Sequence, residues 1–118
     1  MKHEQIYMDT ISKFGHQTQM IKTIEECAEL QKAFAKLLNN WNEKDYNNAI
    51  EEIADVQIMI DQMKLVFGIE AVRCVKKDKI KRLKSRVYDT TKVPTLQPTF
   101  VSFDKKEQAE QEHQANQS

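Results

Sequence analysis

The chain has 118 residues and a formal net charge of zero, so it is long enough for one domain with a modest core, and its charge favours no class of partner. Two glycines and two prolines leave little material for β-turns. A glycine-rich phosphate loop is also absent, which excludes the usual scaffold for γ-phosphate transfer. We therefore expect an all-α protein.

Apolar residues at helical spacing predict four helices, approximately over residues 4–14, 19–38, 43–67 and 70–86. Gly15 and Gly68 are expected to end the first and third helices, and Thr18 to cap the second. The second helix is apolar on two sides, and residues 56–67 of the third are the most apolar stretch of the chain. A helix that is apolar on two sides packs on two sides. We therefore expect a four-helix bundle-like protomer that assembles into a homodimer or homotetramer.

The fourth predicted helix combines apolar residues with a strong positive charge. Between Arg73 and Arg86 it holds eight Lys or Arg against one Asp. We expect its bases to point outward and its apolar residues to point inward, namely Ala71, Val72, Val75, Ile80, Leu83 and Val87. After Asp89 two prolines oppose helix, and residues 104–118 show no apolar pattern. The helical domain is therefore predicted over residues 1–88, and residues 89–118 are predicted to form an extended arm and a disordered tail.

Several features favour a cytoplasmic protein. Cys27 and Cys74 lie inside predicted helices and form no metal or redox pair, so we expect reduced core residues. No apolar run approaches the ~20 residues of a membrane span, and the first residues lack the apolar stretch of a signal peptide. We therefore expect no membrane partner.

Two matched acidic motifs, Glu25–Glu29 and Glu51–Asp55, lie in the second and third predicted helices. Within each motif the acids at i, i+1 and i+4 fall within an arc of about 100°, beside apolar residues. The short connector makes these helices antiparallel, so the six carboxylates can face one another. One motif alone is more simply a solvated helix face. Two matched motifs favour a functional site that binds cations or shares protons, because buried carboxylates must share one or the other.

Carboxylate oxygens without His or Cys are ligands for Mg²⁺ or Mn²⁺ rather than for zinc. Mg²⁺ in proteins often binds a substrate phosphate as well. Lys22 lies one turn before Glu26, and Gln19 lies about another turn earlier, so both are candidates for the mouth of the site. Phosphate contacts are also expected from one side of the fourth helix, where a solvated face is an equally good interpretation, through Lys79, Arg82 and Arg86.

The order E-E-x-x-E followed by E-E-x-x-D resembles the MazG-like nucleotide pyrophosphohydrolases, within the all-α nucleoside triphosphate pyrophosphatase superfamily. The resemblance covers about residues 14–87 and includes Gln19 and the basic fourth helix. It implies a Mg²⁺-dependent homo-oligomer that hydrolyses (d)NTPs to monophosphate and pyrophosphate. By motif position Glu25 would orient or deprotonate the attacking water or bind a further metal ion, and the metal ligands would be Glu26, Glu29, Glu52 and Asp55.

Two other classes of function stay open. A dUTPase-like enzyme or a phosphoribosyl-ATP pyrophosphohydrolase of the same superfamily would share the acids and differ in the base pocket. A non-enzymatic helical adaptor would need no metal and would bind nucleic acid through the fourth helix. Of these partners, a nucleoside triphosphate is favoured over nucleic acid.

Overall fold

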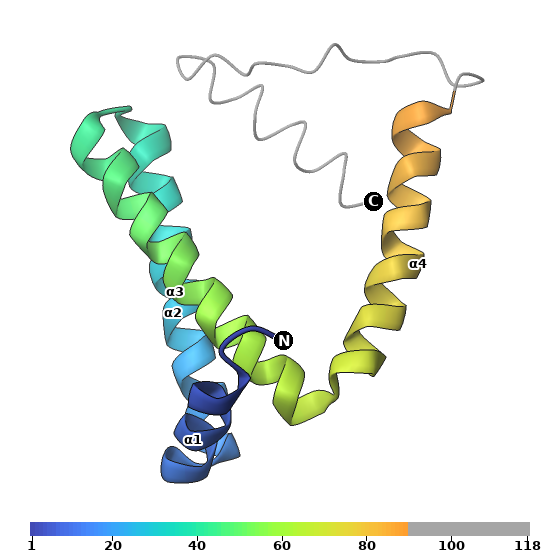
Figure 1. Cartoon of the computed structure of the whole chain (residues 1–118). Coiled ribbons are helices and arrows are strands. Elements are labelled where there is room, and N and C mark those ends of the chain that lie inside the picture. The colour runs from blue at the N-terminus through green and yellow to red at the C-terminus, as the bar shows by residue number, and fades with distance from the viewer. Residues whose placement is uncertain (90–118) are drawn as a thin grey trace.

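The computed structural model describes residues 1–89 and contains, in that part of the chain, four α-helices and no strand. Figure 1 shows α1 (Glu4–Phe14), α2 (His16–Asn39), α3 (Glu43–Phe67) and α4 (Ile69–Tyr88). The all-α class is therefore confirmed. The arm and tail expected beyond residue 89 lie outside the described residues.

The antiparallel hairpin of α2 and α3 is the main packed unit, and the two helices lie side by side along their length (Figure 1). Its core contains two small residues and one large one, Ala33, Leu37 and Ala49, which are 1%, 6% and 4% exposed. Small side chains allow the two helix backbones to approach closely. Asn42 begins α3 as its N-cap, because its side-chain oxygen accepts a hydrogen bond from the Asp45 backbone N–H at 2.9 Å.

Both glycines stand where a helix ends and the chain turns. Gly15 has φ of 93° and Gly68 has φ of 111°, a backbone region that other residues rarely adopt. Gly15 lets α1 pass directly into α2, so α2 begins at His16 instead of Gln19, and the prediction that Thr18 caps it is wrong. The turn places α1 against the hairpin, where Tyr7 and Ile11 are buried.

The fourth helix differs most from expectation. It diverges from α3 after Gly68, so the two helices form the arms of a V (Figure 1). None of its residues is buried, so the prediction that its apolar side chains point inward is wrong for the single chain. Cys74 is likewise exposed instead of part of the core, and Cys27 is half-buried.

The apolar side of α4 also carries positive charge. Lys76, Lys79 and Arg86 lie on the same arc of α4 as its apolar side chains. Within residues 1–89, no helix is both long enough and apolar enough to cross a membrane.

Candidate metal centre

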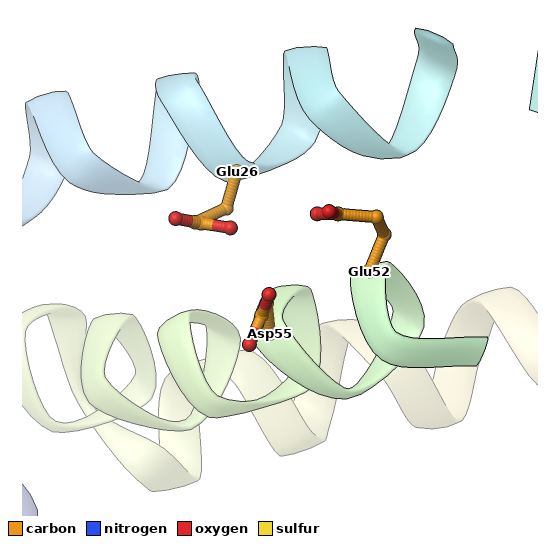
Figure 2. A group of neighbouring side chains, drawn as sticks. All are labelled: Glu26, Glu52 and Asp55. Atoms are coloured by element: carbon orange, nitrogen blue, oxygen red, sulfur yellow. The ribbon is translucent and has the colours of Figure 1, made fainter. Parts of the chain in front are cut away.

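Three carboxylates converge between the two helices of the hairpin (Figure 2). Glu26 projects from the middle of α2, while Glu52 and Asp55 project from the facing turns of α3. One oxygen from each residue lies within 4.8 Å of the others. The spacing of three residues between Glu52 and Asp55 places both on the same side of α3, and the antiparallel pairing brings Glu26 opposite them.

Glu52 is the most constrained of these acids. Its Oε2 is buried and has no hydrogen-bond partner among the described residues. Burial raises the pKa of the Glu52 carboxyl above its usual 4.5, and the negative charges of its neighbours raise it further, in the order Asp55, Glu26, Glu29 and Glu51. A buried, unpartnered carboxylate oxygen is costly, and a bound cation would remove that cost.

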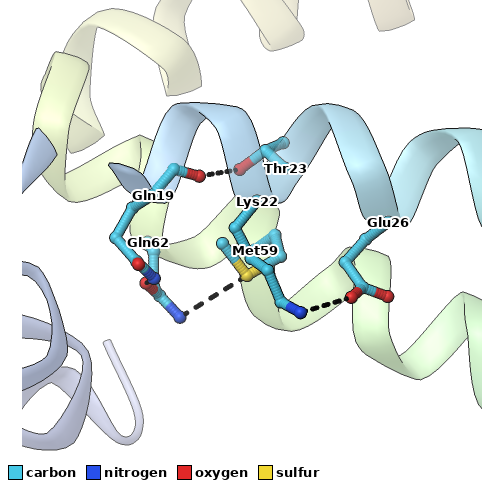
Figure 3. Close-up of polar contacts among 6 residues, drawn as sticks. All are labelled: Gln19, Lys22, Thr23, Glu26, Met59 and Gln62. Carbon is cyan, nitrogen blue, oxygen red and sulfur yellow. Dashed lines mark hydrogen bonds and ion pairs between the residues drawn. The ribbon is translucent and has the colours of Figure 1, made fainter. Parts of the chain in front are cut away.

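Lys22 supplies a positive charge beside the cluster. Its Nζ lies 3.2 Å from Oε1 of Glu26, one helical turn away on α2 (Figure 3). The hydrogen bond and the charge of Glu26 raise the pKa of Lys22, with smaller contributions from Glu25 and Asp55. Because its side chain is 51% exposed, Lys22 can turn toward a ligand without opening the core.

A buried amide pair lies on the N-terminal side of Lys22 along α2. Gln19 Nε2 donates a hydrogen bond to Gln62 Oε1 at 2.7 Å, and the two residues are 5% and 4% exposed (Figure 3). Gln62 Nε2 contacts Met59 Sδ at 3.8 Å, and the Thr23 hydroxyl donates to the Gln19 carbonyl oxygen at 2.8 Å. The sequence prediction missed Gln62. The feature that could have identified it is its position, because it is a polar residue two turns after Asp55 on the otherwise apolar side of α3.

The remaining predicted site residues lie further out. Glu25, Glu29 and Glu51 are exposed and outside the group of three close oxygens, although Glu29 and Glu51 are near enough to affect the pKa of Glu52. On α4, Lys79 lines the groove between the arms of the V. Arg82 and Arg86 are exposed on the same helix and do not join the acids.

The geometry of the three close carboxylates suits a hard divalent cation. In an octahedral Mg²⁺ site neighbouring oxygen ligands are about 3 Å apart, and opposite ones about 4.2 Å. The three oxygens, which lie within 4.8 Å of one another, would move closer together by side-chain rotation on binding one ion. The donors are all carboxylate oxygens, the chemistry that Mg²⁺ and Mn²⁺ prefer.

Comparison of the chain with models of known protein families, with curated proteins and with solved structures found no match. The interpretation of this site therefore depends on its own residues and on the spacing of its two acidic motifs.

Proposed function

We propose that this protein is a Mg²⁺-dependent nucleoside triphosphate pyrophosphohydrolase that converts (d)NTPs to (d)NMPs and pyrophosphate. The observation that carries the proposal is the buried, unpartnered Oε2 of Glu52 beside Glu26 and Asp55. This arrangement supports a bound cation. The resemblance of the two acidic motifs to the MazG-like enzymes supports the choice of reaction.

In this proposal Glu26, Glu29, Glu52 and Asp55 hold the metal, and Mn²⁺ is an acceptable substitute for Mg²⁺. The bound ion would neutralise phosphate charge and polarise a water molecule. The hairpin fixes these ligands before substrate arrives, because they project from helices that pack along their whole length. Metal-bound carboxylates are poor bases, so the proton of the attacking water needs another acceptor.

Glu25 fits that second role. It is exposed and lies one residue before Glu26, so its carboxylate can accept a proton at the solvent side of the site. The water oxygen attacks the α-phosphorus, the bond to the bridging oxygen of the β-phosphate breaks, and pyrophosphate leaves. Lys22 can exchange its contact with Glu26 for a phosphate oxygen during this step.

Phosphate contacts from α4 are also part of the proposal. Lys79 and Gln57 are equally far from Gly68 along the two arms of the V, so Lys79 lies level with the end of the acidic motif of α3. Arg82 and Arg86 lie further along α4, level with the rest of that motif. The carboxylates of Glu26, Glu52 and Asp55 point into the space between α2 and α3, so phosphate contacts from these bases stay a prediction. Gln19 is already hydrogen-bonded to Gln62, and its contact with substrate stays a prediction.

The proposal includes a homodimer or homotetramer in the cytoplasm, where nucleoside triphosphates and Mg²⁺ are both present. Related reactions on dUTP or phosphoribosyl-ATP would use the same acids and differ in the base that is accepted. A second candidate is a nucleic-acid-binding adaptor, because one side of α4 presents a nearly unbroken row of bases, Arg73, Lys77, Lys81 and Lys84.

A panel of common and modified nucleotides with and without Mg²⁺ tests the proposal. We expect Mg²⁺-dependent release of monophosphate and pyrophosphate, and loss of at least about 100-fold in turnover for Glu52→Gln. Glu43→Gln, which changes an exposed acid in the first turn of α3, is the matched control and should keep full activity. No turnover of any nucleotide, together with salt-sensitive nucleic-acid binding that ignores Mg²⁺, would favour the adaptor.

A further inference from the structure

The arms of the V enclose an open groove of about 1090 Å³ that is mainly apolar. One wall belongs to α3 and the other to α4, and the apolar residues that line it include Val56, Ile60, Phe67, Val72, Val75 and Leu83. Four charged side chains, Asp61, Lys64, Lys76 and Lys79, lie among them.

The exposure of this groove is unusual for a folded chain. Phe67 is 62% exposed, and Val75 and Leu83 are each 54% exposed. Among residues 1–89 only six apolar side chains are buried, and none of them is on α4. A contiguous apolar surface of this kind marks a contact with another molecule, because scattered single residues are normal but an apolar face along a whole helix is not.

We propose that a second copy of this chain occupies the groove, with α4 of each copy lying in the V of the other. The two copies would then form one core from two α3 helices and two α4 helices. This inference specifies the interface of the homo-oligomer proposed above, and it does not depend on the reaction.

Charge complementarity favours this occupant. Each α4 carries Lys76 and Lys79 on its groove side, and α3 contributes Asp61 and Lys64 to the groove wall. A partner's α4 laid along α3 can therefore place Lys76 or Lys79 against Asp61. Direct pairing of the two α4 helices alone would bring like charges together.

The lengths of the two walls support the same arrangement. The 20 residues of α4 span about 30 Å and the 25 residues of α3 about 37 Å, so one α4 fits within the length of a partner's α3. Because each copy has one groove and one α4, mutual insertion fills both grooves at once. Such a two-fold contact closes the assembly and does not continue into a chain of subunits.

The experiment is light scattering on the full chain at micromolar concentration. We expect two or four times the chain mass of 13.9 kDa. Leu83→Asp should reduce the measured mass by half or more and weaken association about 100-fold, because it places a carboxylate among apolar groove residues. Ser85→Asp makes the same change in charge on the same helix, at an exposed position outside the groove lining, and should leave the mass unchanged.

A second readout uses the unmodified chain and so does not depend on how a variant folds. Dilution below the dissociation constant of the oligomer should speed hydrogen exchange in α4 more than in α2, because α4 buries no residue within its own chain. A monomer at micromolar concentration would overturn both the groove contact and the proposed homo-oligomer. An oligomer that survives Leu83→Asp but is dissociated by Ile24→Asp, on the outer face of α2, would overturn only the groove contact.

Discussion

Replacement of Gln62 by Leu tests whether the buried amide pair holds α2 and α3 in register. In the native protein Gln19 and Gln62 are 5% and 4% exposed and are joined by a hydrogen bond of 2.7 Å. Gln62→Leu keeps most of the side-chain volume but leaves the amide of Gln19 buried without this acceptor. Such a loss costs about 1–3 kcal/mol of the free energy of unfolding. For a domain of this size, a loss of about 2 kcal/mol lowers Tm by roughly 8–16 °C.

The assay is thermal unfolding followed by circular dichroism, at one fixed protein concentration because Tm of an oligomer depends on concentration. The double variant Gln19→Leu/Gln62→Leu removes both amides, and we expect it to recover most of the stability that Gln62→Leu loses. Gln31→Leu, an exposed glutamine on α2, is the matched control and should change Tm little. A double variant as unstable as the sum of the two single variants would refute the pairing.

Three further predictions concern the acids, a helix cap and the core. The pKa of the Glu52 carboxyl is raised in the folded protein, so the metal-free fold should lose stability as pH rises from 4.5, the ordinary pKa of Glu, through the raised pKa. Urea unfolding at a series of pH values measures this loss, and Glu52→Gln should remove it. Stabilisation by Mg²⁺ should appear only on the high-pH side of this range, and equal stabilisation at pH 4 would contradict the prediction. Asn42→Ala removes the N-cap of α3 and should cost about 1 kcal/mol in the same assay, whereas an unchanged midpoint would mean that the cap contributes nothing. Leu37→Ala should cost about 2–5 kcal/mol, and a loss below 1 kcal/mol would mean that Leu37 is not part of the core.

Much of the fold could be predicted because helix patterns are local. The apolar spacing predicted where α3 begins, and Gly68 predicted where it ends, because a glycine in a sharp turn leaves little freedom in where the helix stops. The start of α2 was missed because a single residue, Gly15, makes the whole turn, while the sequence offered Thr18 as a more ordinary cap. Helix periodicity contains no information on the angle between consecutive helices, so the divergence of α4 could not be foreseen.

The centre of the candidate site was more predictable than its surroundings. Glu26, Glu52 and Asp55 converge because their spacing places them on facing sides of an antiparallel pair, a consequence of helix geometry. The pair formed by Gln19 and Gln62 depends on the relative shift of two helices along each other, and their separation of 43 residues gives no local signal. Only the packed hairpin specifies that shift.

The most direct test of the central claim is ³¹P NMR of the products formed from a nucleoside triphosphate and Mg²⁺ in ¹⁸O-enriched water. Attack by water on the α-phosphorus predicts that the label enters the monophosphate and that pyrophosphate is released unlabelled. Labelled orthophosphate with a nucleoside diphosphate as the first products would contradict the proposed reaction.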